Sequence, residues 1–258
     1  MKPVLFEFGK FHVYGYGLMI MIGILVASYI FTSNSKAKGY DEDSIFNLIL
    51  ITVIMGVLGG KILFIVTEIK DIIKNPSILL DFGNGFVVYG AIIFGALAIY
   101  AYCKRKNWNT LDLLDSVVPA VAIAQGFGRI GCFLAGCCYG AETSLPIGVV
   151  FPNNELSFAP SGVHLHPTQI YSSIFDFILG VFLLYYFKRS KVKGKTFSLY
   201  IILYSIGRFF VEFLRNDPRG NVGILSTSQF IAIFTLIFGI IIFYVVNRGK
   251  ENRASEEK

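Results

Sequence analysis

The chain has 258 residues, of which 54% are apolar and 16% are charged, and its mean hydropathy is +0.63. Soluble domains carry about a quarter charged residues, so this composition excludes an ordinary soluble domain. A disordered chain and a collagen-like rod are excluded as well, and four clustered cysteines are too few for a secreted module held by disulfides. The net charge of +6 indicates no nucleic-acid partner, because basic cytoplasmic loops are common in membrane proteins. The composition is therefore typical of a polytopic membrane protein.

Seven apolar stretches are long enough to cross the hydrocarbon of a bilayer, which takes about 20 helical residues. They cover residues 14–33, 45–67, 86–103, 115–140, 167–187, 197–214 and 227–247. The connecting loops are short, and no repeat of fixed period is present. We therefore expect an all-α transmembrane bundle of about seven spans that forms a single membrane domain over residues 1–258.

Lysine and arginine residues are distributed unevenly among the loops. The loops after the first, third and fifth stretches and the C-terminal tail hold 14 of them, whereas the N-terminal segment and the other loops hold 6. Because basic loops remain in the cytoplasm, this distribution predicts an external N-terminus and a cytoplasmic C-terminus. The loop 141–166, which contains no lysine or arginine, is expected to face outward.

Several ionisable side chains lie inside the apolar stretches, where a charge is costly and marks a functional site by default. Tyr204, Arg208 and Glu212 recur at every fourth position, so they share one face of a helix. Lys61 lies in the second stretch and Asp176 in the fifth. Neutralisation of these charges by opposite charges on other helices explains Asp176, and Arg208 with Glu212, at least as readily as a direct chemical role does.

Arg129 is the charge for which the functional interpretation is favoured. It lies in the sequence Gly-Phe-Gly-Arg-Ile-Gly, and we expect Gly128 and Gly131 to leave open space beside it for a ligand headgroup. The spacing of Gly126, Gly128 and Gly131 matches a dinucleotide-binding fingerprint, but that motif needs a preceding strand and here lies within a span. Converging arginines favour an anion, and a phospholipid phosphate suits their planar geometry. These residues predict a lipid-phosphate site near the outer face.

A second concentration of polar residues runs from His164 to Tyr171, where the fifth stretch begins. Pro167 suits the first turn of a helix. Taken alone, this segment indicates a capped helix start with interfacial histidine and tyrosine side chains.

Together these residues resemble the bacterial prolipoprotein diacylglyceryl transferase family over nearly the whole chain. The motifs that carry the resemblance are His166-Pro-Thr-Gln-Ile-Tyr171, Gly128-Arg129-x-Gly through Gly140, and Tyr204-x-x-x-Arg208-Phe-x-x-Glu212-Phe-x-Arg215. The resemblance implies an enzyme of the bacterial plasma membrane that moves the diacylglyceryl group of phosphatidylglycerol onto the lipobox cysteine of a preprolipoprotein, forming a thioether. It implies phosphatidylglycerol, the preprolipoprotein signal peptide and the lipid bilayer as partners, without a metal or nucleotide cofactor.

The resemblance also implies the roles of individual residues. The catalytic residues would be Arg129, Arg208, Tyr89 and Glu212. The substrate-binding residues would be Tyr16, Lys61, Gly90, Gly128, Gly140, His166, Gln169, Tyr171 and Tyr204. The cationic cluster would stabilise the departing phosphate, while a base would help to form the substrate thiolate.

The chain departs from the family pattern at several positions. Tyr89 stands where the family usually has histidine, and Lys61 stands where it has arginine. A tyrosine hydroxyl is a poor base at neutral pH, although it can hydrogen-bond a lipid headgroup. Cys132 and Cys137 replace the usual asparagine and glutamate, and Cys138 follows directly. We expect the three cysteines to be packing or local hydrogen-bonding replacements, since free cysteine commonly behaves as a small hydrophobe.

Three other functions remain open at this point. A divergent homologue could bind the same anionic lipid and use another acceptor, or perform no transfer. A membrane thiol–disulfide protein could be built on Cys132, Cys137 and Cys138, since such proteins pair a reactive thiol with a resolving thiol. A transporter or channel is disfavoured, because the stretches show no two-half repeat. The transferase is favoured because residues suited to binding a phosphate match the family pattern, in addition to the hydropathy.

Overall fold

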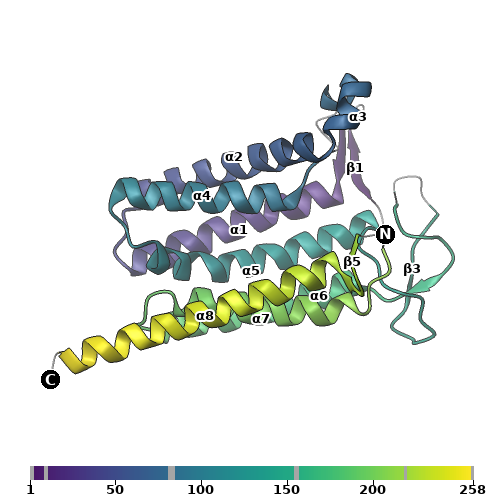
Figure 1. Cartoon of the computed structure of the whole chain (residues 1–258). Coiled ribbons are helices and arrows are strands. Elements are labelled where there is room, and N and C mark those ends of the chain that lie inside the picture. The colour runs from purple at the N-terminus through teal and green to yellow at the C-terminus, as the bar shows by residue number, and fades with distance from the viewer. Residues whose placement is uncertain (1–2, 9–10, 81–84, 154–156, 218–219, 257–258) are drawn as a thin grey trace. The chain divides into compact units, whose positions relative to one another are not determined.

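The computed structural model describes residues 3–8, 11–80, 85–153, 157–217 and 220–256. Helices make up most of this part of the chain (Figure 1). They are α1 (Gly15–Ala37), α2 (Glu42–Thr67), α3 (Ile69–Lys74), η1 (Pro76–Leu80), α4 (Val88–Lys106), α5 (Thr110–Ala135), α6 (Thr168–Arg189), α7 (Lys195–Glu212) and α8 (Thr227–Glu256). The strands form short antiparallel pairs, which are β1 (Val4–Phe8) with β2 (Phe11–Tyr14), β3 (Val149–Val150) with β4 (His164–Leu165), and β5 (Asn221–Val222) with β6 (Leu225–Ser226).

Five of the helices are long and apolar enough to cross a membrane. They are α1, α2, α5, α6 and the part of α8 from Thr227 to Gly249. The expectation of a polytopic helical membrane protein is thus confirmed, whereas the number of seven spans and the orientation stay predictions. The other two expected stretches coincide with α4 and α7. The helix α7 carries three charged residues within its 18 positions, and α4 ends in three consecutive basic residues.

The chain divides into two compact units. One unit combines Met1–Phe31 with Leu114–Lys258, and the other consists of Thr32–Leu113. The single membrane domain expected over residues 1–258 stays a prediction. In the second unit, α2 and α4 run side by side and approach closely at Gly59 and Gly90 (Figure 1). A Cβ atom on Gly90 would collide with the carbonyl oxygen of Gly59, so these positions require glycine for helix packing.

In the first unit, α5, α6, α7 and α8 pack together. Glycines allow α5 and α6 to approach closely, because the ring of Phe177 packs on Gly126 and the side chain of Ile123 packs on Gly180. The buried carboxylate of Asp115 on α5 accepts hydrogen bonds of 2.7 and 2.8 Å from backbone N–H groups at the start of α7. These contacts confirm that Gly126 belongs to helix packing, and they fix α5 against the two helices that follow.

The helix α5 ends at Ala135, five residues before the end of the expected stretch 115–140. The reason is local, because Gly136 adopts a φ of +68°, which an α-helix cannot continue. Cys138 also has a positive φ of 64°, an uncommon conformation for a residue with a Cβ atom. The expected stretch 115–140 contained all three cysteines, and this bound is wrong, since Cys137 and Cys138 lie in the loop after the helix.

Candidate functional site

A small cavity in the first unit lies among α5, α6 and α7, with room for little more than a water molecule. It brings together the side chains of residues that the sequence singled out as membrane-embedded charges. The lining residues are Arg129, Ser172, Phe175, Asp176, Tyr204, Gly207, Arg208 and Val211. Two arginines and a tyrosine of the predicted phosphate site therefore share one cavity.

Arg129 extends from the last third of α5. No heavy atom would contact a Cβ atom on Gly128 within 4 Å, so the expected open space beside Arg129 is present on that side. Gly131 is different, because a Cβ atom there would lie 3.1 Å from the ring of Tyr16 and 3.3 Å from Met19. The expectation of open space at Gly131 is therefore wrong, since this glycine allows α1 to pack against α5. Within the described ranges, Arg129 forms neither a hydrogen bond nor an ion pair.

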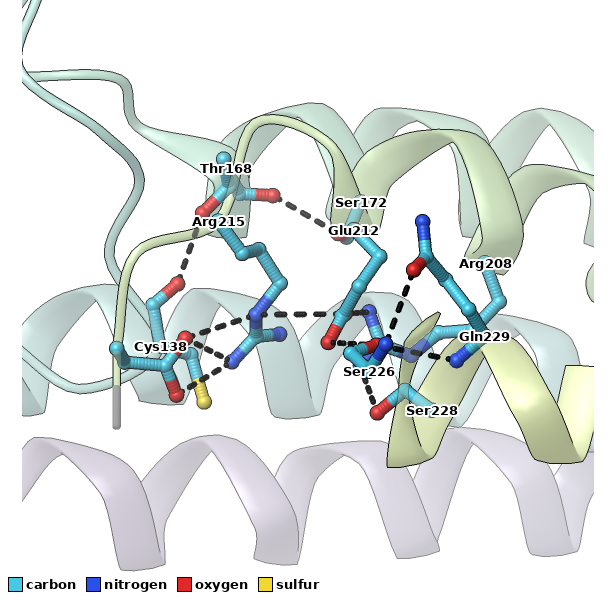
Figure 2. A network of polar contacts seen from close by, with 10 residues as sticks. Cys138, Thr168, Ser172, Arg208, Glu212, Arg215, Ser226, Ser228 and Gln229 are labelled. Carbon is cyan, nitrogen blue, oxygen red and sulfur yellow. Dashed lines mark hydrogen bonds and ion pairs between the residues drawn. The ribbon is translucent and has the colours of Figure 1, made fainter. Parts of the chain in front are cut away.

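Arg208 is held in one orientation by two partners (Figure 2). Its guanidinium lies 2.7 Å from the Glu212 carboxylate and donates a hydrogen bond of 2.9 Å to the Ser228 hydroxyl. Both side chains of the ion pair are shielded, since 14% of Arg208 and 5% of Glu212 are exposed. The Ser226 hydroxyl donates a further hydrogen bond of 2.9 Å to Glu212. Arg208 and Glu212 thus neutralise each other within α7, rather than between helices as the sequence interpretation had it.

Arg215 extends this network towards the end of α5. Its guanidinium donates two hydrogen bonds of 2.9 Å to the Asp217 carboxylate, and it lies 3.9 Å from Glu212. The Arg215 cation also interacts with the Cys138 thiol, and its guanidinium lies between Glu212 and the cysteine loop, residues 136–138 (Figure 2). Arg215 lies in a motif that resembles the family, but it was not among the predicted site residues. Its position three residues after Glu212, on the same side of the helix, could have identified it.

The motif from His166 to Tyr171 positions the loop that follows α5. The buried side chains of Thr168 and Gln169 donate hydrogen bonds of 2.8 Å to the backbone carbonyls of Cys138 and Cys137. The Oε1 atom of Gln169 is buried and has no hydrogen-bond partner among the described residues. The amide side chain therefore supports the loop with its nitrogen and retains a free acceptor.

His166, Tyr171 and Gly140 lie around the same loop. The Nδ1 atom of His166 is 3.2 Å from the Tyr171 hydroxyl. Gly140 donates its backbone N–H to the carbonyl of His166 at 3.0 Å, and a Cβ atom there would lie 2.6 Å from the Leu214 carbonyl oxygen. Gly140 thus permits the close approach of three segments, while the parts of His166 and Tyr171 in substrate binding stay predictions.

The three cysteines after Arg129 converge in space. The sulfur atoms of Cys132, Cys137 and Cys138 all lie within 4.8 Å of one another, and none of the three forms a disulfide within the described residues. Side-chain hydrogen bonds with Cys132 and Cys137, together with the Arg215 cation, hold the pKa of the Cys138 thiol well below its usual range. The loop therefore combines soft ligand atoms with a thiol that favours its ionised form.

Other predicted residues lie apart from this cluster in the chain. Lys61, Tyr89 and Gly90 belong to the second unit. Lys61 lies over the ring of Phe64, with 5.3 Å between its Nζ atom and the ring centroid. The side chain of Tyr89 is exposed, whereas Gly90 is buried against α2. Their proposed roles towards the substrate stay predictions.

Two parts of the site were missed or left unassigned by sequence reasoning. Asp176, which is 2% exposed, lines the cavity of the two arginines, although the sequence left open whether it neutralises another charge or has a chemical role. Ser226, the last residue of β6, hydrogen-bonds Glu212, and Ser228 in the first turn of α8 hydrogen-bonds Arg208. Ser226 and Gln229 form a capping box with reciprocal hydrogen bonds of 3.1 and 3.2 Å, and the spacing Ser-x-x-Gln was the available signal.

Comparison with known proteins identifies similar sequences over nearly the whole chain. Residues 3–245 match the family described as prolipoprotein diacylglyceryl transferase. A Clostridium tetani protein named phosphatidylglycerol–prolipoprotein diacylglyceryl transferase is 62% identical over 245 residues, which cover 95% of this chain and 98% of that protein. A Clostridium perfringens protein, with the same name followed by the number 2, is 59% identical over 260 residues and 100% of both chains. The similarly named protein of Clostridioides difficile is 34% identical over 258 residues, again covering 100% of both chains.

Proposed function

The chain belongs to the prolipoprotein diacylglyceryl transferase family, and we propose that it transfers the diacylglyceryl group of phosphatidylglycerol to the cysteine thiol of preprolipoproteins. The product is a thioether, and glycerol phosphate leaves. The observation that best supports this reaction is Arg129, a guanidinium with neither a hydrogen bond nor an ion pair among the described residues, at a cavity between membrane helices. Such a cation favours an anionic ligand, and the headgroup of phosphatidylglycerol supplies a phosphate.

The two arginines of the cavity have different roles towards the phosphate in this proposal. Arg129 offers unused N–H donors, which can form paired hydrogen bonds with two phosphate oxygens. Arg208 is oriented before the lipid arrives, because Glu212 and Ser228 hold its guanidinium. When the bond between carbon and phosphate oxygen breaks, negative charge grows on the departing phosphate. Donors that are already oriented stabilise this charge without reorganisation.

The residues around the cavity position the rest of the substrate in this proposal. Tyr204 lines the cavity with both arginines, and Gln169 retains its free acceptor near the cysteine loop. Since the cavity has room for little more than a water molecule, the lipid headgroup requires the side chains to part. By the family resemblance, Lys61 and Tyr89 are also expected to contribute to headgroup binding.

We further propose seven spans, with the N-terminus outside and the C-terminus in the cytoplasm. The helices α4 and α7 would add to the five apolar spans, giving an odd number that separates the termini. The ion pair of Arg208 with Glu212 supports a membrane position for α7, because pairing reduces the cost of embedding both charges. The excess of basic residues in alternate loops supports the orientation.

Complementation tests the proposed function directly. The chain is expressed in bacteria depleted of their own transferase, and thioether lipidation of a reporter lipoprotein is scored by gel mobility and mass spectrometry. We expect the reporter to gain the mass of one diacylglyceryl group. Normal insertion of the chain without any lipidation would instead support a divergent homologue that uses another acceptor.

A further inference from the structure

Three thiols that the transfer reaction leaves without a role meet at the C-terminal end of α5. Cys132 lies in the last turn of the helix, and Cys137 and Cys138 follow in the loop. Their sulfur atoms lie within 4.8 Å of one another, and all three side chains are partly accessible. Packing explains the partial burial of each cysteine, but it does not require three sulfur atoms to converge on one point.

We propose that Cys132, Cys137 and Cys138 bind a single thiophilic metal ion of the zinc(II) type, whose open coordination position takes the acceptor cysteine thiol. The coordination of the acceptor thiol rests on the proposed function, whereas the metal site does not depend on it. Thiolates are the protein ligands that select zinc and copper(I) over hard cations. Zinc–sulfur bonds of about 2.3 Å place tetrahedral sulfur ligands about 3.8 Å apart, so the observed spacing needs only a small closure.

The shape of the loop brings the thiols together. Positive φ angles at Gly136 and Cys138 reverse the chain after α5, so the two later cysteines fold back towards Cys132. Thr168 and Gln169 fix the carbonyls of Cys138 and Cys137 from the other side. Residues that orient the ligands of a metal in this way are typical of protein metal sites. The loop therefore holds its sulfur atoms in place before a ligand binds.

The surrounding charges suit a thiolate cluster. Three thiolates and one divalent cation carry a net charge of −1, which rises to −2 when a fourth thiolate binds. Arg215 contacts the Cys138 side chain and opposes this charge directly. Arg129 lies three residues before Cys132, so both side chains project from the same face of α5. The bound metal would thus lie beside the cation proposed to hold the phosphate.

An open coordination position supplies the chemistry. Among the described residues, the cluster comprises three ligands and no fourth histidine, cysteine or carboxylate. Three protein ligands with one open position characterise catalytic zinc sites, and a thiol that coordinates such a metal loses its proton. In the proposed step, the acceptor S–H bond breaks, its proton passes to solvent, and a sulfur–metal bond forms. The sulfur then bonds to the glycerol carbon, the carbon–oxygen bond breaks with its electrons moving to the phosphate, and the thioether leaves the metal.

Metal binding is tested first on the full chain purified in detergent without chelators. Elemental analysis for zinc and copper should find about one equivalent per chain. After metal removal, added Co²⁺ should produce a sulfur-to-cobalt charge-transfer band that Zn²⁺ abolishes. Loss of a residue that only orients a metal ligand weakens metal binding by about 10–100-fold, so loss of a ligand itself in Cys137→Ser or Cys138→Ser should weaken binding by more than about 100-fold. Cys103→Ser is the matched control, since Cys103 is a buried cysteine of α4 outside the cluster, and it should retain the band.

The acceptor position is tested with a synthetic lipobox peptide. A peptide with a cysteine should shift the cobalt band of the wild-type chain, whereas the same peptide with serine should not. Removal of the metal should lower lipid transfer at least about 10-fold, and Zn²⁺ should restore it. Full transfer by the metal-free chain would overturn the acceptor role, even though the transferase function would stand. Metal binding without any transfer in complementation would overturn the proposed function and support the metal site alone.

Two outcomes would overturn the metal site itself. One is the absence of both bound metal and a cobalt band in the folded wild-type chain. The other is a disulfide between two of the three cysteines, detected by mass spectrometry after alkylation of protein purified without reductant. That result would favour the thiol–disulfide alternative instead.

Discussion

Arg129 and Arg208 line one cavity, but their replacement should have different effects on the protein. Arg129→Ala removes a side chain that has no hydrogen-bonded or ion-paired partner in the described part of the chain, and the buried Asp176 of the same cavity keeps Arg208 as a neighbouring cation. We expect the free energy of unfolding to change by less than about 1 kcal/mol. A charge-assisted hydrogen bond contributes about 1.5–3 kcal/mol, and loss of a donor to a developing anion lowers kcat by about 10²–10³-fold. Transfer should therefore fall at least about 100-fold in a protein that remains folded.

Arg208→Ala should damage both activity and stability. Among the described residues, it leaves the Glu212 carboxylate, which is 5% exposed, with only the Ser226 hydroxyl at 2.9 Å and the Arg215 guanidinium at 3.9 Å. Breaking a buried ion pair costs about 3–5 kcal/mol, and the remaining contacts place the expected loss near the lower limit of about 3 kcal/mol. The double variant Arg208→Ala with Glu212→Gln should recover part of this stability without recovering transfer.

The assay combines two measurements on the same variants. Reporter lipidation in depleted cells gives the transfer rate, and unfolding in detergent micelles by titration with sodium dodecyl sulfate gives the stability. Arg105→Ala, at an exposed cation near the end of α4, is the control and should change neither. Near-normal transfer in Arg129→Ala would refute the phosphate site. Equal losses of stability in the Arg129 and Arg208 variants would refute the distinction between an unpaired and a paired arginine.

Three further predictions concern the scaffold and the membrane. Asp115→Ala removes the acceptor of two backbone N–H groups at the start of α7, at 2.7 and 2.8 Å, and should lower the unfolding free energy by about 1–3 kcal/mol in the same titration. Gly207→Ala places a Cβ atom against the ring of Phe175 and should cost about 1–3 kcal/mol, which Phe175→Leu should partly restore. A reporter inserted near Asn153 should be external. A reporter fused after Lys258, which lies outside the described residues, should be cytoplasmic. A protease-accessible C-terminus in intact spheroplasts would contradict this orientation.

The helices and the cationic cluster were predictable because both signals are local. Each expected apolar stretch coincides with a helix, since hydropathy averaged over about 20 residues reports burial in lipid directly. A charge within such a stretch is equally visible, so Arg129 and Arg208 were identified without knowledge of the fold. The shared helix face of Arg208 and Glu212 followed from helical spacing alone, and the structure shows the two side chains paired on it.

The features that sequence reasoning missed depend on backbone conformation or on distant segments. The end of α5 at Ala135 results from the positive φ of Gly136, and many glycines in membrane helices do not terminate the helix. The hairpin of β1 with β2 precedes the first span in a segment that hydropathy does not resolve. The contacts of Arg208 with Ser228 and of Arg215 with Cys138 join residues whose register is set only by packing of the helices.

The start of α6 shows why a matching motif need not mark ligand contacts. Its strongest sequence match to the family includes Thr168 and Gln169, each 1% exposed, and both side chains bond to the backbone of the cysteine loop. One turn further on, the Ser173 hydroxyl donates a 2.9 Å hydrogen bond to the carbonyl of Gly126 on α5. The next turn presents Asp176 to the cavity of the arginines. One polar face of α6 therefore fixes the cysteine loop and the helix that carries Arg129. A change on this face should alter the geometry of both segments before it removes any contact with a ligand.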